Sequence, residues 1–115
     1  MADCLFCRIV AGEIPATIVK RSDEALAFRD IDAKAPVHVL VIPTKHVAAV
    51  RDSKGADGER LLGRLFAFAA ETAAEQGLDR DGYRIVTNTG KNAGQSVDHL
   101  HLHVLGGRKL SWPPG

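Results

Sequence analysis

The chain has 115 residues, of which 45% are hydrophobic and 25% charged, and its 15 Lys and Arg residues nearly balance 14 Asp and Glu residues. These values are typical of one globular domain, which we expect to span residues 1–115, and a net charge of +1 argues against a nucleic-acid partner. Because the sequence has no signal-peptide pattern and no apolar run of membrane-spanning length, we expect a soluble cytoplasmic protein without a membrane partner.

The first part of the chain predicts a short helix followed by three strands. Apolar pairs spaced four residues apart predict the helix over 4–11, which the following glycine and proline end. Segments 17–20 and 25–29 predict a hairpin, because turn-forming residues separate them. The β-branched run 37–43, bounded by prolines, predicts a buried strand that is an antiparallel neighbour of the hairpin.

The second part predicts a long helix and two more strands. After a polar loop, Asp57 is expected to cap a helix that runs to about Gln76 and packs on the sheet. The stripe expected to face the core consists of Leu61, Leu62, Leu65, Phe66, Ala69 and Ala73. Segments 83–88 and 99–105 predict strands, with the loop 89–97 between them.

Three histidines, His99, His101 and His103, alternate with apolar residues in the last predicted strand. On a strand, this spacing places the imidazoles on one face, with neighbours roughly 6.5–7 Å apart. Zinc binds each nitrogen at about 2.0–2.1 Å, so one ion cannot easily collect all three. We therefore expect the three histidines to have different roles. The polar face of a half-buried strand is the alternative interpretation.

Phosphorus chemistry is one role that this face can support. A neutral imidazole is a good nucleophile near pH 7, because its unperturbed pKa is about 6.5. A second histidine on the same face can bind phosphate oxygens, and no metal is needed for that step. The preceding loop, which contains Gly94, Gln95 and Ser96, can direct backbone N–H groups at an anion. Walker and dinucleotide motifs are absent, and no nucleophile elbow surrounds Ser96.

Cys4 and Cys7 form a second constellation, which supplies half of a metal site. No strand precedes this pair, which argues against a thioredoxin-type redox site, and two cysteines make a disulfide framework improbable. The remaining interpretations are zinc ligands or unused thiols. His46 and His99 are the candidate partners, and the four residues would form a closed Cys2His2 tetrahedron with a structural role.

The segment 99–105 resembles the signature of the histidine triad family of nucleotide-binding proteins, in which three histidines alternate with hydrophobic residues. The similarity extends over nearly the whole chain and points to the nucleoside phosphoramidase branch. It is carried by segments 6–15, 27–31, 36–46 and 94–97 and by the WPPG tail. The resemblance implies an α+β fold with a five-stranded, mainly antiparallel sheet, one long and one short helix, and a homodimer that joins two sheets into one.

The resemblance also implies a catalytic role for each histidine. In that family the middle histidine, His101 here, attacks the α-phosphorus of an adenosine 5′-phosphoramidate, and water then hydrolyses the nucleotidyl-histidine to AMP. His103 would bind the phosphate, and His38 and His99 would help to hold the catalytic tautomer. Ser96 matches the residue that hydrogen-bonds the leaving-group side.

A purine-nucleotide site follows from the same resemblance. Asp30 matches the carboxylate that takes the ribose hydroxyls, and Asn88 matches a phosphate contact beside the Gly94 and Gln95 loop. The apolar slot for the purine would consist of Phe6, Ile9, Phe28 and Ile31. Trp112 resembles a tail residue that reaches the neighbouring subunit's site. The set Cys4, Cys7, His46 and His99 is similar to that of the zinc-bearing members.

Three alternatives remain. The chain could be a dinucleoside polyphosphate hydrolase, although that branch usually has a different lead into the triad and lacks the WPPG tail. It could be a nucleotide-binding regulatory protein with vestigial catalysis. The triad itself could be a metal site. Transferases of the wider superfamily replace the third histidine with glutamine, so His103 favours hydrolysis.

Overall fold

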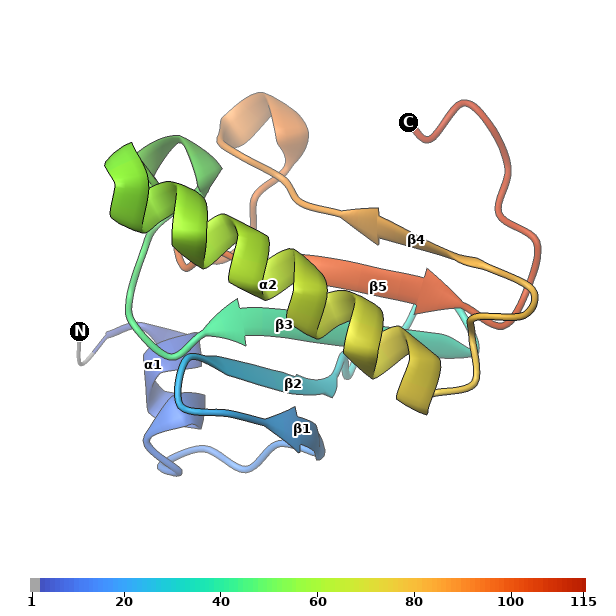
Figure 1. The fold of residues 1–115 in the computed structure, drawn as a ribbon, viewed down its shortest axis with the longest axis horizontal. Coiled ribbons are helices and arrows are strands. Elements are labelled where there is room, and N and C mark those ends of the chain that lie inside the picture. The colour runs from blue at the N-terminus through green and yellow to red at the C-terminus, as the bar shows by residue number, and fades with distance from the viewer. Residues whose placement is uncertain (1–2) are drawn as a thin grey trace.

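The computed structural model describes residues 3–115 as one antiparallel sheet with a helix on each face (Figure 1). The elements in chain order are α1 (Leu5–Val10), β1 (Ile18–Arg21), β2 (Ala25–Arg29), β3 (Val37–Pro43), η1 (Val50–Asp52), α2 (Gly55–Glu75), β4 (Tyr83–Val86), η2 (Lys91–Ala93) and β5 (Leu102–Gly106). The five strands have the order β1-β2-β3-β5-β4, and every neighbouring pair is antiparallel. The predicted α+β class and five-stranded sheet, with one long and one short helix, are confirmed.

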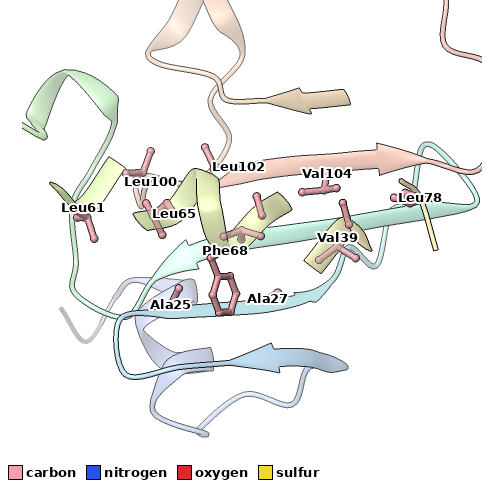
Figure 2. Close-up of a cluster of buried hydrophobic side chains, with 13 residues drawn as sticks. Ala25, Ala27, Val39, Leu61, Leu65, Phe68, Leu78, Leu100, Leu102 and Val104 are labelled. Carbon is pink, nitrogen blue, oxygen red and sulfur yellow. The ribbon is translucent and has the colours of Figure 1, made fainter. Parts of the chain in front are cut away.

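The central strands are buried on both faces of the sheet. Successive side chains point to opposite sides, so each strand contributes to two clusters. One set of alternating residues in β2 and β3 packs against α2, and Figure 2 shows this cluster, with Phe68 of α2 directed at the sheet. The other set packs against α1. This second cluster consists of Phe6, Ile9, Leu26, Phe28, Leu40 and Ile42.

Helix α2 differs from the prediction at its start and in its buried stripe. It begins at Gly55 with Lys54 as the N-cap residue, so the prediction that Asp57 caps it is wrong. Asp57 lies in the first turn, where its negative charge interacts favourably with the helix dipole. Phe66, which the sequence predicts in the buried stripe, is 44% exposed, whereas Phe68 is buried. The buried side of α2 includes the polar Thr72, which a hydrophobic pattern does not select. Its hydroxyl is buried and donates to the carbonyl of Phe68 at 2.8 Å.

Glycines allow the chain to enter and leave α2. A Cβ at Gly58 would lie 2.3 Å from the carbonyl carbon of Ser53, so the close return of the chain at this point requires glycine. At the other end Gly77, with φ of 78°, ends the helix as expected, and Leu78 N–H donates to the carbonyl of Ala73 at 3.0 Å. None of the helices described in residues 3–115 combines the length and apolarity that crossing a bilayer requires.

The histidine segment is a strand only in its second half. Strand β5 begins at Leu102, so the prediction of one strand over 99–105 is wrong for its first three residues. The reason is a different main-chain partner, because Leu100 N–H donates to the carbonyl of Val47 at 2.6 Å and pairs with no strand. His99 and His101 therefore precede β5, and only His103 lies within it, opposite Leu40 of β3.

Candidate active site

A cleft of about 600 Å³ opens on the face of the sheet that also carries α1. It lies over β3, β5 and β4, since His103 pairs with Leu40 and Val86 and shares their side of the sheet. Residues 110–114 of the C-terminal tail close one side. The predicted site residues that line the cleft are Asp30, His38, Asn88, Ser96 and His103.

The ring of His101, which is 4% exposed, is held in one tautomer. Its Nδ1 lies 2.7 Å from the carbonyl oxygen of His99. A carbonyl oxygen can only accept, so Nδ1 carries the proton. Nε2 has no hydrogen-bond partner among residues 3–115 and keeps its lone pair. This is the form that an imidazole nucleophile requires. The group of His99 that holds this tautomer is its main-chain carbonyl.

A chain of hydrogen bonds fixes the tautomers of His38 and His103. The backbone N–H of Lys34 donates to His38 Nδ1 at 3.0 Å, so the proton of His38 is on Nε2. That Nε2–H donates to His103 Nδ1 at 2.9 Å. His103 must then carry its own proton on Nε2. His103 therefore offers the cleft an N–H donor, which suits the phosphate-binding role expected of it.

Burial keeps both of these histidines neutral near pH 7. Desolvation lowers the pKa of His103 to about 4, and the neighbouring His101 and His38 act in the same direction. Desolvation also lowers the pKa of His38, against the opposing effect of Asp30. The contact of 3.3 Å between His38 Nε2 and Asp30 Oδ2 therefore joins a carboxylate to a neutral ring and is not an ion pair.

Asp30 has two structural roles at the cleft. Its Oδ1 accepts the backbone N–H of Asp32 at 2.8 Å and so forms a turn after β2. Its Oδ2 faces His38. Carboxylate oxygens accept more than one hydrogen bond each, so Asp30 retains capacity for a ligand's hydroxyl groups.

Gln95 holds the loop between β4 and β5. Its Oε1 accepts the N–H of Gly90 at 2.9 Å, and its Nε2 donates to the carbonyls of Ala48 and Val97 at 2.7 and 3.1 Å. Both ends of the amide are engaged within the protein, so Gln95 positions the loop. Gly94, with φ of 77°, supplies the left-handed turn that leads to Ser96, which is exposed at the cleft.

The four residues expected to form the purine slot divide into two groups. Phe6, Ile9 and Phe28 are 4 to 6% exposed and belong to the core cluster beneath α1, whereas Ile31 is fully exposed. The ring of Phe6 also packs edge-on against His101, with centroids 5.2 Å apart and planes at 87°. The structure thus places Phe6 against the ring of His101 and leaves Ile31 open to a ligand.

Arg84 of β4 fastens the C-terminal tail. Its Nη2 donates to the carbonyl of Ser111 at 3.1 Å, and its guanidinium lies 5.9 Å from the centroid of the Trp112 ring. Trp112 is 80% exposed. Its expected reach into a neighbouring subunit's site stays a prediction.

The second constellation assembles as the sequence predicts. Cys4, Cys7, His46 and His99 each place one ligand atom within 4.8 Å of the others. The Nδ1 of His46 lies 3.3 Å from Cys7 Sγ, and the Nδ1 of His99 lies 3.3 and 3.5 Å from the two sulfurs. Bonds of about 2.0–2.3 Å in a zinc tetrahedron separate its ligands by roughly 3.3–3.8 Å. The cluster could therefore hold a metal ion such as zinc.

The protons of this cluster also fit a metal. His99 Nε2 lies 2.9 Å from the carbonyl oxygen of Pro43, so Nε2 carries the proton and Nδ1 keeps its lone pair for a metal. Burial, with a contribution from Cys4, raises the pKa of the Cys7 thiol. A metal ion would have to displace that proton, as is usual for thiolate ligands.

A second group, formed by Asp30, His38 and His103, is close enough to share an ion. Its hydrogen bonds argue against one, because Lys34 N–H occupies the Nδ1 lone pair of His38 and leaves the proton on Nε2. A neutral imidazole has only one lone pair. A metal site formed by His103 with Asp30 and His38 therefore does not fit these hydrogen bonds.

Several contacts that define the site were not predicted from the sequence. They are the N–H of Lys34, the carbonyls of Pro43 and His99, and the hydroxyl of Thr87, which donates to the carbonyl of His101 at 2.9 Å. Three of these four groups belong to the main chain. Every residue type carries a main-chain carbonyl and every type except proline an N–H, so no sequence pattern could have indicated these groups.

Residues 11–110 match the family described as HIT domain, and the chain therefore belongs to the HIT family. An uncharacterized HIT-like protein of Synechococcus elongatus is 50% identical over 113 residues, which cover 98% of this chain and 97% of that one. Among solved structures, the chain is similar to the HIT family hydrolase from Legionella pneumophila, with 49% identity, a TM-score of 0.94 and coverage of 98% and 100% of the two chains. A histidine triad nucleotide-binding protein from Candida albicans shares 29% identity, with a TM-score of 0.82 and coverage of 98% and 85%.

Proposed function

We propose that the protein is a purine nucleoside phosphoramidase, which hydrolyses adenosine 5′-phosphoramidates and aminoacyl-type adenylates to AMP. The observation that carries this proposal is the state of His101, whose Nδ1–H donates to the His99 carbonyl at 2.7 Å while Nε2 keeps its lone pair. The names of two similar structures, a hydrolase and a nucleotide-binding protein, support the two halves of the proposal.

In the first step, His101 Nε2 attacks the α-phosphorus and forms an N–P bond. The bond between phosphorus and the amine breaks, its electron pair leaves with the amine nitrogen, and that nitrogen takes up a proton from solvent. The ring of His101 gains positive charge and retains Nδ1–H, so the carbonyl of His99 stabilises the intermediate. Ser96, exposed at the cleft, hydrogen-bonds the leaving-group side.

In the second step, water attacks the same phosphorus. A P–O bond forms, the bond to His101 breaks, AMP leaves, and the water's second proton passes to solvent. Throughout both steps the Nε2–H of His103 donates to the phosphate oxygens, because the bond from His38 reserves His103 Nδ1 as the acceptor. In this site Asp30 binds the ribose hydroxyls, Asn88 contacts the phosphate, and Ile31 packs against the purine.

Zinc has a structural role in this proposal. Cys4, Cys7, His46 and His99 would hold it, and when bound it would cross-link α1 to the segments that follow β3 and precede β5. The nucleophile and the phosphate donor come from the histidines of the chain, so the chemical step requires no metal.

We also propose a homodimer that joins two sheets into one. Strand β4 ends the strand order, so within residues 3–115 no strand pairs with its outer edge, and free edges favour pairing. Helix α2 exposes Phe66, at 44%, and Ala70. The opposite side of α2 pairs Glu75 with Lys20 of β1 at 2.6 Å, which places the apolar side toward β4. A second copy that pairs β4 with β4 would cover both features.

Replacing Phe66 with Glu should convert this dimer into a monomer, because the substitution places a carboxylate in the proposed apolar contact. Light scattering coupled to gel filtration measures the mass directly. Glu71→Gln is the matched control, since Glu71 pairs with Arg64 on the polar side of α2, and it should remain dimeric. A monomeric parent protein, or a dimeric Phe66→Glu variant, would contradict the interface.

Steady-state kinetics on paired substrates tests the activity. We expect a higher kcat/KM for an adenosine 5′-phosphoramidate than for a diadenosine polyphosphate, and rapid quenching with an alkaline denaturant should trap an AMP-protein adduct visible by mass spectrometry. The reverse preference would identify a dinucleoside polyphosphate hydrolase. Tight AMP binding without turnover of either substrate would instead identify a nucleotide-binding regulatory protein.

A further inference from the structure

His99 belongs to two constellations at once. Its side chain lies in the Cys4, Cys7, His46 cluster, and its carbonyl oxygen accepts the Nδ1–H of His101. We propose that Cys4, Cys7 and His46 are positioning residues for the reaction, and that a metal ion bound by them with His99 orients the nucleophile through the His99 carbonyl. This inference rests on the proposed function, and it assigns the metal cluster a role in turnover beyond its structural role.

The peptide group between His99 and Leu100 is the link. Its carbonyl holds His101 at 2.7 Å, and its N–H donates to the carbonyl of Val47 at 2.6 Å. Val47 follows the cluster residue His46. One peptide plane is therefore tied on both sides to residues of the metal cluster, directly at His99 and through one neighbour at His46. A change in the position of either histidine would rotate the carbonyl that fixes the tautomer of His101.

Helix α1 provides another link to the nucleophile. Phe6 lies in sequence between Cys4 and Cys7, and its ring contacts both His101 and His99, with centroids 5.2 and 5.9 Å away. Ligation of the two cysteines would thus fix the aromatic ring that packs edge-on against the nucleophile. The N-terminus of α1 depends on the same atoms, because Cys4 Sγ accepts the N–H of Cys7 at 3.4 Å.

Without a metal ion, these links are weak. The contacts between sulfur and the two Nδ1 atoms are 3.3 to 3.5 Å long, and a thiol is a poor hydrogen-bond donor. A metal ion would replace them with bonds of about 2.0–2.3 Å. Misplacement of a reacting group by about 1 Å can lower a rate about 100-fold, so the restraint is large enough to matter for catalysis.

Cys7→Ala provides the kinetic test, because Cys4 also caps α1 and its replacement would confound the result. We expect kcat on an adenosine 5′-phosphoramidate to fall about 10- to 100-fold, the usual scale for loss of orienting contacts, while KM and AMP affinity change little. Val10→Ala is the matched control. Val10 packs from α1 against the hydrophobic cluster that contains Phe6, but it takes part in none of the contacts of the metal cluster. We expect this variant to retain kcat.

A second measurement does not depend on activity. Long-range ¹H–¹⁵N NMR spectra identify which nitrogen of His101 carries the proton, and they can be recorded on the zinc-loaded and the metal-stripped wild-type protein. We expect a single Nδ1–H form with zinc and a mixture of tautomers without it, restored when zinc is added back. An unchanged His101 spectrum in the metal-free protein would overturn the proposal, whatever the kinetics show.

The two measurements separate the possible failures. A wild-type protein without phosphoramidase activity would contradict the proposed function, and the NMR comparison would still decide whether the cluster positions His101. An active enzyme whose Cys7→Ala variant keeps its full kcat would overturn the positioning role and leave the activity standing. If Cys7→Ala does not fold, metal removal from the wild-type protein decides both readouts.

Discussion

Replacing His101 with alanine should abolish turnover of an adenosine 5′-phosphoramidate. The imidazole provides the nucleophile of the first step of the proposed mechanism, so we expect kcat to fall on the order of 10⁴-fold or more, as for loss of the nucleophile in other covalent mechanisms. AMP affinity should change little, because Asp30, Asn88 and His103 still line the cleft. Stopped assays with isothermal titration of AMP measure both quantities.

A variant with more space sharpens this test. In His101→Gly, added imidazole can occupy the vacated position and supply the missing lone pair, so turnover should recover in proportion to imidazole concentration. His103→Gly serves as the comparison, because its defect is loss of a donor to the phosphate and imidazole rescue should be much weaker. Full activity of His101→Ala would refute the mechanism outright.

Replacing Phe68 with alanine should lower the free energy of unfolding by about 3–5 kcal/mol, the range for large-to-small changes at buried aromatic positions. Phe68 is 2% exposed and contacts the sheet from the middle of α2 (Figure 2). Its removal would leave a cavity among strands that cannot collapse without disturbing their pairing. Urea unfolding followed by circular dichroism gives the value, provided that the slope with denaturant is unchanged.

Phe68→Leu is the control for this stability prediction, because it keeps most of the buried volume and should cost less than about 1.5 kcal/mol. Equal losses in the two variants would show that the aromatic ring itself, including its contact with Lys20 at 5.6 Å, provides the stabilisation. A loss below about 1 kcal/mol in Phe68→Ala would contradict the position of this residue in the core.

Hydrophobic periodicity predicted most of the fold, because strands β2 and β3 and helix α2 bury continuous apolar patterns. It was less accurate where a polar residue is buried with its hydrogen bond satisfied, as at Thr72, since the pattern then misses one side of the helix. The predicted start of the last strand was also wrong, because it included His99 and His101. A main-chain hydrogen bond from Leu100 to Val47 diverts the chain before β5 begins.

The sequence predicted side chains of the candidate site but not the main-chain groups that orient them. The Cys4, Cys7, His46 and His99 cluster assembles as expected, since residue types with metal affinity are visible in a sequence. The tautomers of His38, His99 and His101 depend on the N–H of Lys34 and the carbonyls of Pro43 and His99. Only a three-dimensional structure brings such groups next to the rings that they orient.

The N–H of Lys34, which starts the hydrogen-bond chain through His38 to His103, has a consequence for mutational tolerance. Every amino acid except proline supplies this donor, so substitutions at position 34 should leave the direction of the chain intact. The position can therefore vary freely among relatives while its contribution to the site is retained. Sequence variability at Lys34 would hide a functional constraint that a single change, to proline, would expose.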